Sequence, residues 1–357
     1  MKAHLDGKTS LLLSILAVVV LFPVSRSIAS QLPEPAGLTL SDPIRIRGQV
    51  FSSADPLVIE GLKVENSDGA GIVIEECGNV VIRNNRISQC QGSGILVKNS
   101  DGVIVQENTL ESNRSGGVVF EGVTDSSISN NRFMVSGNSH GIGAYGVKNV
   151  DILDNEFSAS DGVESTRSSH ELNYAIWIED YRSTESNRLV GSEEILISGN
   201  RIDDPSLSGI SVISSKHVEI RDNLLQQNSR HGIRMRDVEE TTVHHNEVYD
   251  ASKYGLYLEF NVSDSKIYEN TISGGSLAGI MIRDSCDNSV YRNQISERSG
   301  NAIILRFSLE QGDESAPQTA GNAIFENNLS VQRGVEAILV EDGCSGNQIS
   351  NNEVSEI

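Results

Sequence analysis

The segment HGIRMRDVEETTVHHNEVYDASKYGLYLEF, residues 231–260, contains the pattern that decides the fold of this chain. Two short runs, Gly232-Ile233-Arg234-Met235 and Gly255-Leu256-Tyr257-Leu258, each begin with a glycine and start 23 residues apart. Apolar residues recur at every second position in both runs. That spacing is typical of a β-strand and leaves no stripe of apolar residues at helical spacing.

The same run recurs along most of the chain. Its openings are Gly71, Gly94, Gly117, Gly141, Ala175, Gly209, Gly232, Gly255, Gly279, Ala302 and Ala337. A period of 23 or 24 residues with three short strands cannot bury a core by itself, but stacked periods can. The sequence therefore predicts an all-β protein, a right-handed parallel β-helix (solenoid) of about 12 coils. The right hand follows from the usual rule for parallel connections.

An asparagine stands fourteen residues after most of these openings. The set is Asn85, Asn108, Asn131, Asn155, Asn223, Asn246, Asn293 and Asn351, with Asn270 one residue later. Asparagine tolerates left-handed backbone and bonds neighbouring backbone groups at tight bends. We interpret these residues as structural, forming a ladder of stacked amides inside one turn of each coil.

Composition limits the partners of the chain. It has 357 residues, 32 glycines, 7 prolines and a formal net charge of −21. That charge argues against nucleic acid as a partner and against adhesion to an anionic membrane. The cysteines are Cys77, Cys90, Cys286 and Cys344. Their spacing fits no zinc motif, so we expect apolar fillers in the core and neither a metal site nor a cofactor. Calcium binding stays an open alternative, although no motif supports it.

The beginning of the chain resembles a targeting signal. Lys2 and Lys8 precede an apolar run from Leu11 to Val24, and small residues follow. This predicts a secretory signal peptide over residues 1–30 and a secreted or periplasmic protein. We expect residues 31–357 to form a single β-helix domain with no membrane span.

The period is interrupted at three places, which predicts loop insertions at about 158–173, 180–193 and 308–321. All three flank a Gly-led or Ala-led strand, and regular coils lie between the first two and the third. Solenoid proteins often carry function in such insertions. We therefore expect the loops to border a groove on this strand.

Side chains that point outward from this strand can be listed coil by coil, because alternate residues face opposite sides. From the coil of His140 onward, aromatic, imidazole and guanidinium groups fill these positions. We predict catalytic roles for His231, Arg234, Arg236, Tyr254, Tyr257 and His140. We predict substrate binding by Tyr145, Tyr174, Trp177, Glu179, Glu259, Arg283 and Arg306. The alternative is structural: aromatic stacks and pairs such as Arg236 with Glu259 also stabilise ladders.

These residue types suit an acidic polysaccharide. Aromatic faces pack against sugar rings, and arginine binds carboxylates through paired hydrogen bonds. Arginine also stabilises the carbanion that forms when a proton leaves the carbon beside a uronate carboxylate. A histidine would take that proton, and a tyrosine would supply one. A hydrolase with two catalytic carboxylates is less favoured, because this face has no obvious cluster of acids. His244 and His245 lie at the asparagine turn, away from this face, and we interpret them as structural or solvated.

Residues 231–296 resemble the repeat region of periplasmic mannuronan (alginate) C5-epimerases, and similar repeats occur in several polysaccharide lyases and in nitrous-oxide-reductase maturation proteins. The resemblance implies a right-handed parallel β-helix that acts on an acidic polysaccharide. The epimerases carry a Tyr-Gly-hydrophobic-Asp-Pro-His motif. The comparable positions here, His231 to Arg236 and Tyr254 to Glu259, contain no Asp-Pro-His, so the catalytic residues of those enzymes cannot be carried over.

The sequence thus predicts an exported protein that binds, and modifies, a uronate-containing polysaccharide. The expected chemistry is β-elimination by a uronan lyase or C5-epimerisation. Two alternatives remain. One is a non-catalytic carbohydrate-binding or polysaccharide-export scaffold that uses the same groove. The other is an accessory protein of the maturation type.

Overall fold

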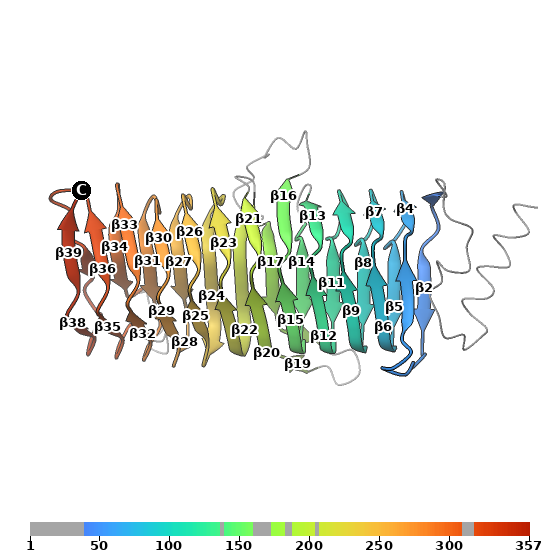
Figure 1. Cartoon of the computed structure of the whole chain (residues 1–357). Helices are drawn as coiled ribbons and strands as arrows, with labels where there is room; N and C mark the ends of the chain where they lie inside the picture. The colour runs from blue at the N-terminus through green and yellow to red at the C-terminus, as the bar shows by residue number, and fades with distance from the viewer. Residues whose placement is uncertain (1–38, 136–138, 160–172, 183–187, 204–206, 309–317) are drawn as a thin grey trace, which may run out of the picture.

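The computed structural model describes residues 39–135, 139–159, 173–182, 188–203, 207–308 and 318–357. Within these ranges the chain forms β-strands and turns, with no α-helix. The strands of successive coils pair in parallel and build one long rod (Figure 1). The prediction of a parallel β-helix is confirmed. No helix in the described part of the chain has the length and hydropathy that a membrane crossing requires.

Three faces run along the rod, and each takes one strand from every coil. The first face carries the Gly-led strands. It contains β2 (Ile44–Arg47), β5 (Ile72–Glu75), β8 (Ile95–Lys98), β11 (Val118–Glu121), β14 (Ile142–Tyr145), β17 (Tyr174–Glu179), β22 (Ser208–Arg221), β24 (His231–Glu239), β27 (Tyr254–Glu259), β31 (Ala278–Arg283), β34 (Asn301–Arg306) and β37 (Ile338–Val340).

The second face follows the first in each coil, and the long strands β22 and β24 run from one toward the other. It contains β3 (Leu57–Glu60), β6 (Gly78–Arg83), β9 (Asp101–Gln106), β12 (Thr124–Ser129), β15 (Lys148–Leu153), β20 (Ser192–Ser198), β25 (Thr242–His244), β29 (Lys266–Tyr268), β32 (Ser289–Tyr291), β35 (Ala323–Phe325) and β38 (Gln348–Ser350). The short β28 (Val262–Ser263) lies between the two faces.

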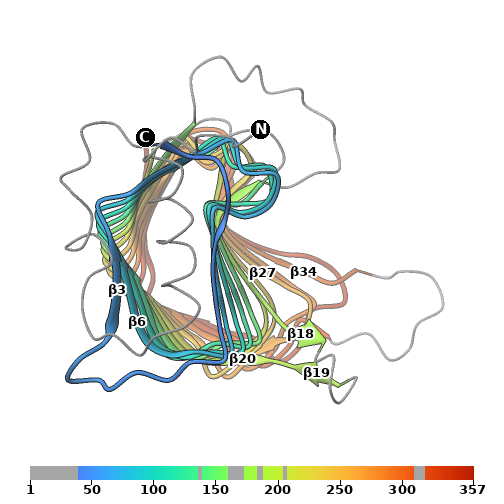
Figure 2. The same cartoon turned by 90° about the vertical axis from the view of Figure 1, so that its right-hand side faces the viewer.

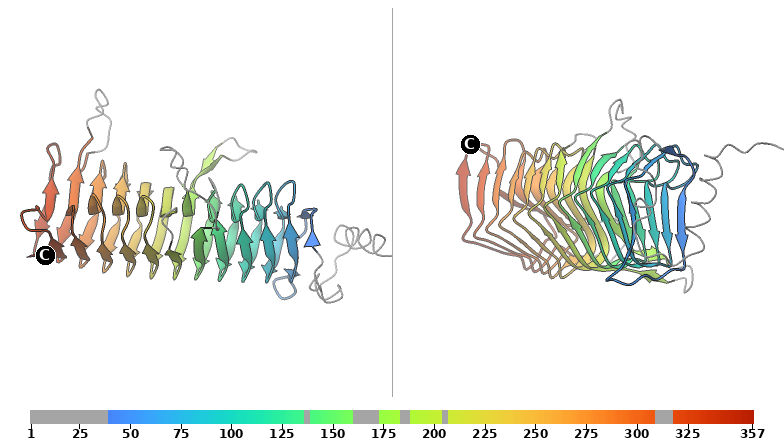
Figure 3. Two further views of the ribbon diagram at one scale, coloured as in Figure 1. Left: turned by 90° about the horizontal axis from the view of Figure 1, so that it is seen from above. Right: turned by 45° about the vertical axis from the view of Figure 1, so that its right-hand side comes forward.

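The third face closes each coil. It contains β1 (Thr39–Leu40), β4 (Lys63–Glu65), β7 (Arg86–Ser88), β10 (Thr109–Glu111), β13 (Arg132–Val135), β16 (Glu156–Ala159), β21 (Arg201–Asp203), β23 (Leu224–Gln226), β26 (Glu247–Tyr249), β30 (Thr271–Ser273), β33 (Gln294–Glu297), β36 (Asn328–Val331) and β39 (Glu353–Glu356). Viewed along the axis, the coils superimpose into one profile (Figure 2), and from other directions the strands lie side by side along the rod (Figure 3).

The core fills the inside of this profile with aliphatic side chains. Ile233 of β24 pairs in register with Leu256 of β27, and Leu256 pairs with Ile280 of β31. All three side chains are buried. Gly232 opens its run because the backbone is crowded there: a Cβ would lie 2.6 Å from the Gly255 carbonyl oxygen and 2.4 Å from Cγ1 of Val248. Any side chain would push neighbouring coils apart.

The asparagine ladder is present. Asn223 Nδ2 donates to Asn246 Oδ1 at 2.9 Å, and Asn246 Nδ2 donates to Asn270 Oδ1 at 3.0 Å. The left-handed backbone, however, lies one residue earlier, at Asp222 and His245, with φ near +55°. The expectation that the ladder residues themselves are left-handed is therefore wrong. Their amides face the interior, whereas the residue before them bends the chain.

Asn351 also differs from its predicted place. It takes the left-handed conformation with φ 54°, and its neighbour Asn352 accepts the hydrogen bond from Asn327. The four cysteines are free thiols; Cys77 and Cys90 are buried and serve as fillers, while Cys286 and Cys344 are partly exposed.

The predicted signal peptide and most of the insertions at 158–173 and 308–321 lie outside the described residues. Part of the insertion at 180–193 is described. There β18 (Tyr181–Arg182) pairs antiparallel with β19 (Leu189–Val190). This hairpin connects β17 of the first face to β20 of the second face and projects at the corner between the two (Figure 2). Whether the insertions together border a groove stays a prediction.

Candidate functional site

The predicted outward residues of the first face stand in register on consecutive coils. Trp177 pairs with Ser211, Ser211 with Arg234, and Arg234 with Tyr257. Further along, Tyr257 pairs with Met281 and Glu259 with Arg283. Tyr257, Met281 and Ile304 form a small apolar cluster separate from the main core, which shows that this row faces away from the interior. The row has the predicted register, but Ser211, Arg234 and Tyr257 are buried, so this part of it is not an open, solvent-exposed surface.

Three rings pack together where β24 meets β27; we call His231, Tyr254 and Tyr257 the ring cluster. The His231 and Tyr254 rings stack at 5.4 Å with 7° between their planes. Tyr257 lies 5.1 Å from His231 and 5.0 Å from Tyr254, tilted to both. His231 is only 2% exposed. The ring faces are therefore largely used by one another, and little ring face remains for a sugar.

Burial and positive charge keep His231 neutral. Burial lowers its pKa most, and the charges of Arg230, Arg234 and Lys253 lower it further, to about 2. Its Nδ1 is buried and has no hydrogen-bond partner. Burial likewise raises the pKa of Tyr257 to about 12, so that phenol stays protonated. The ring cluster thus joins an unprotonated imidazole to a protonated phenol.

The arginines of this face are largely paired with carboxylates. Arg234 Nη2 lies 2.6 Å from Glu259 Oε2, and Arg306 contacts Glu341 through two bonds of 2.6 and 2.7 Å. Arg283 Nη1 donates to Tyr257 OH at 3.2 Å. These pairs hold the guanidinium groups in place. They also occupy much of the donor capacity that the sequence analysis assigned to substrate.

Arg236 lies apart from the other arginines. Its guanidinium is 5.6 Å from the ring centroid of Phe260, and the side chain is exposed. The cross-strand pair suggested for Arg236 with Glu259 is replaced by the pair of Arg234 with Glu259. Arg236 therefore stands at the edge of the site and not within the ring cluster.

A second group of rings lies on β17 and the coil before it. Trp177 is 4.9 Å from the His140 ring and 5.2 Å from the Tyr174 ring. Its Nε1 donates to Glu179 Oε2 at 2.9 Å. The backbone N–H of Tyr174 donates to Nδ1 of His140 at 3.2 Å. Burial lowers the pKa of His140 to about 4, so this ring is neutral and only its Nε2 is left for other partners.

Tyr145 and Tyr174 complete that group. Burial raises the pKa of Tyr145 to about 12, and the nearby charges of Glu179 and Glu121 act in the same direction. The Tyr174 side chain is fully buried, and its hydroxyl has no hydrogen-bond partner. That hydroxyl lies close enough to the Arg234 and Arg230 guanidinium groups for their charges to oppose the effect of burial on its pKa.

Unpartnered buried atoms mark this face of the molecule. Within the described residues, eight buried side-chain polar atoms lack a hydrogen-bond partner. Four of them belong to this face or its edge: Tyr174 OH, Ser211 Oγ, Arg230 Nε and His231 Nδ1. Such atoms are costly and rare in folded proteins. Their concentration between the two ring groups indicates a place where a polar ligand would be stabilised.

Ser211, Arg230 and Lys253 were not among the predicted site residues. Ser211 stands between Trp177 and Arg234 in its row. The sequence could have indicated it, because a small side chain there separates two large ones. Arg230 and Lys253 immediately precede His231 and Tyr254, so they lie one position outside the predicted rows of outward side chains. Only the structure shows that they act on the charge of His231.

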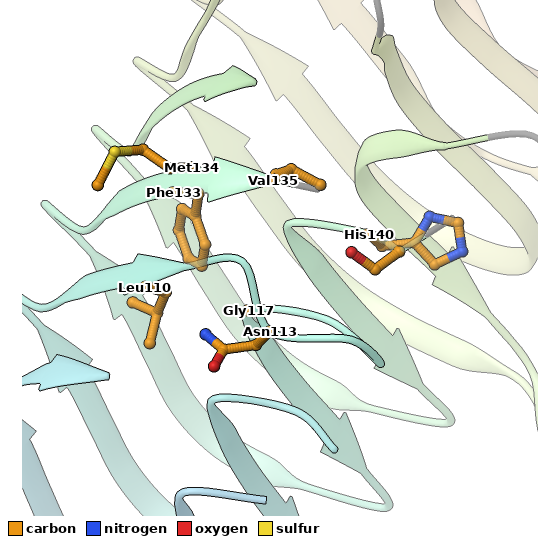
Figure 4. A pocket seen from close by; sticks show the side chains of 8 residues that line it. Leu110, Asn113, Gly117, Phe133, Met134, Val135 and His140 are labelled. Atoms are coloured by element: carbon orange, nitrogen blue, oxygen red, sulfur yellow. The ribbon is translucent and has the colours of Figure 1, made fainter. Parts of the chain in front are cut away.

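Two other features carry less chemistry. A recess lined by Leu110, Phe133, Val135 and His140, among others, has room for about one water molecule (Figure 4). His244 and His245 lie away from the first face, as expected; His244 Nε2 is hydrogen-bonded to Glu219 Oε1, and His245 Nε2 lies 3.0 Å from Glu269 Oε2. Among the described residues, no group of three or more His, Cys, Asp or Glu side chains is arranged to hold a metal ion.

A rod of parallel coils with one polar, aromatic-rich outer face defines a protein of the β-solenoid class. The chain belongs to the right-handed β-helix region family, whose model matches residues 48–190 and 188–354. Among curated proteins, none matches the sequence.

Solved structures share the fold at low sequence identity. A variant of the periplasmic alginate epimerase AlgG has a TM-score of 0.62 at 14% identity, over 92% of this chain and 82% of that one. The A-module of the mannuronan C-5 epimerase AlgE6 of Azotobacter vinelandii has a TM-score of 0.53 at 12% identity, over 90% and 91%. The GH136 lacto-N-biosidase of Eubacterium ramulus has a TM-score of 0.51 at 11% identity, over 91% and 64%.

Proposed function

We propose that this chain is an exported protein that binds a uronate-containing polysaccharide along the first face and modifies it by C5-epimerisation or β-elimination. The observation that carries the proposal is the juxtaposition of the ring cluster, the arginines and four unpartnered buried polar atoms on consecutive coils. The epimerases of similar fold support it by analogy only, because fold does not imply function.

The chemistry follows from the protonation states. Neutral His231 would accept the proton from C5 of a uronate residue, and cations would stabilise the negative charge that develops on its carboxylate. Epimerisation then requires a proton to return to C5 from the opposite face of the sugar, from a group other than Tyr257, because Tyr257 packs against His231. Alternatively, Tyr257 would protonate the departing glycosidic oxygen as the C4–O bond breaks, which leaves an unsaturated sugar.

A bound carboxylate would also make His231 a better base. The free protein holds its pKa near 2 partly through three neighbouring cations. A ligand anion beside those cations would offset their charge and raise the pKa of the imidazole. Binding and activation are therefore coupled in this proposal.

One observation favours a second candidate, a binding protein without catalysis. The guanidinium groups of Arg234 and Arg306 are already paired with Glu259 and Glu341. The chain also lacks the Asp-Pro-His motif of the epimerases. A scaffold would need only the shape and charge of the face.

Incubation with alginate and with polygalacturonate, read by two assays, tests the proposal. Ultraviolet absorbance reports unsaturated product, and deuterium uptake at C5 without cleavage reports epimerisation. We expect one signal for the wild type and a loss of about a hundredfold or more in His231→Asn, with binding retained. Tyr268→Phe, on the second face, is the matched control. Binding without either signal would favour the scaffold, and no binding to any polyuronate would refute both candidates.

A further inference from the structure

Arg230 and Lys253 lie on adjacent coils at the corner where the third face leads into the first. Arg230 immediately precedes His231 at the start of β24, and Lys253 precedes Tyr254 at the start of β27. The backbone N–H of Lys253 donates to the Arg230 carbonyl oxygen at 2.8 Å. Both residues are half-buried. Two cations are thus stacked directly beside the ring cluster.

These cations differ from the arginines further along the face. Arg234, Arg283 and Arg306 each have a carboxylate within ion-pair distance. Arg230 and Lys253 form no ion pair with any described residue, although acidic residues outnumber basic ones by 49 to 28 in the whole chain. In addition, Arg230 Nε is buried and has no hydrogen-bond acceptor.

This arrangement is unfavourable without a ligand. Like charges on neighbouring strands repel one another, and a buried guanidinium N–H without an acceptor loses its hydrogen bond to water. Burial and the Arg230 charge both lower the pKa of Lys253. An anion at the corner would relieve the repulsion and supply the missing acceptor. Planar carboxylates match the fork of N–H donors on arginine particularly well.

We infer that Arg230 and Lys253 form the subsite that binds the carboxylate of the uronate residue lying over His231, in place of the paired arginines of the first face. The inference rests on the proposed function. It deepens that proposal by assigning recognition to two residues outside the predicted rows. The paired arginines then serve to hold Glu259, Tyr257 and Glu341 in position.

Binding of sodium polygalacturonate, measured by affinity electrophoresis and calorimetry, tests the subsite. We expect Arg230→Gln and Lys253→Gln each to weaken binding about tenfold, since each removes charged hydrogen bonds. Arg306→Gln, which removes a paired arginine, should weaken it less. Arg292→Gln combined with Lys266→Gln removes two positive charges from the second face, as many as the Arg230→Gln, Lys253→Gln double variant removes, and should leave binding unchanged. Equal losses in Arg306→Gln and Arg230→Gln would overturn the inference.

A second measurement does not depend on a sugar. Inorganic sulfate should raise the melting temperature of the wild type more than that of the Arg230→Gln, Lys253→Gln double variant. The double variant removes two positive charges that repel each other and have no carboxylate partner. In the absence of sulfate it should therefore fold and melt no lower than the wild type. A sulfate effect of the same size in both proteins would mean that the corner holds no anion site.

The two measurements separate the two proposals. If the wild type binds polyuronate and the double variant binds it equally well, the subsite is wrong and the proposed function stands. If the wild type binds no polyuronate but sulfate protects it through Arg230 and Lys253, the anion site stands and the polysaccharide assignment falls.

Discussion

At the scale of single residues, the structure separates charges that are satisfied from charges that are not. Arg234 and Glu259 form a close pair, which lowers the pKa of the glutamate against the effect of burial. Arg230, four residues before Arg234 and just ahead of β24, has no such partner among the described residues. Arg234 and Arg230 differ in the direction of their side chains and in their neighbours. This difference decides which guanidinium group is available to bind a ligand.

Glu297 is a buried acidic residue whose carboxyl oxygens lack hydrogen-bond partners. Its side chain is fully buried at an inward position, in register with Val331 of the next coil, and neither carboxyl oxygen has a hydrogen-bond partner. Burial raises its pKa from 4.5 to about 7. The folded protein therefore favours the protonated carboxyl. The stabilising effect is complete below about pH 4.5 and is lost as the pH rises through 7.

We expect Glu297→Gln to remove this pH dependence. The variant should match the wild type near pH 5 and exceed its free energy of unfolding by about 3 kcal/mol at pH 9, as an upper bound from the pKa difference. Denaturant unfolding at both pH values measures it, with the exposed Glu326→Gln as the control. A difference between wild type and Glu297→Gln that does not change with pH would show that Glu297 is not a buried acid.

At the scale of elements, the asparagine ladder joins neighbouring coils. Asn223 Oδ1 accepts hydrogen bonds from the backbone N–H and the side chain of Asn200, at 2.9 and 3.0 Å. Its own Nδ2 donates to Asn246 and to two backbone carbonyls. One side chain thus satisfies buried groups in three successive coils. No apolar residue of similar size can do this.

Replacing one ladder residue tests that role. Asn223→Ala leaves the buried backbone N–H of Asn200 without its acceptor and removes the Nδ2 donor from the carbonyl oxygens of Ile197 and Arg221, so we expect a loss of about 3 kcal/mol in the free energy of unfolding. Asn328→Ala, at an exposed position on the third face, should change it by less than about 0.5 kcal/mol. Equal effects of the two substitutions on the denaturant midpoint would show that the ladder contributes nothing specific.

At the scale of the whole molecule, the rod sets the length of the surface. The polar part of the first face extends from β17 to β34, over six consecutive coils. With about 4.8 Å between paired strands, this part is roughly 24 Å long. A linear polymer that runs along the rod can contact several coils at once, whereas a single sugar cannot.

The affinity for oligouronates should therefore rise with oligomer length and level off once the ligand spans roughly 24 Å. Calorimetry with a series of defined oligogalacturonates measures the trend. Neutral oligosaccharides of the same lengths are the control and should bind more weakly at every length. If the monomer binds as tightly as the long oligomers, the ligand does not extend along the rod.

The repeat in the sequence was sufficient to predict the coil, the three strands, the rows of the first face and the presence of the amide ladder. These follow from spacing, because a residue in one coil must stand beside its equivalent in the next. The position of a residue within the repeat therefore determines which residue it pairs with in the next coil. The ring cluster of His231, Tyr254 and Tyr257 could be foreseen for the same reason.

The tertiary structure decided what spacing does not control. It determined that Glu259 pairs with Arg234 and not Arg236, that the bend lies at Asp222 and not Asn223, and that Arg230 and Lys253 are without carboxylate partners among the described residues. Each outcome depends on side-chain direction and on which neighbours bury a group. Pairing and burial are properties of the assembled surface, and no single period of the sequence contains them.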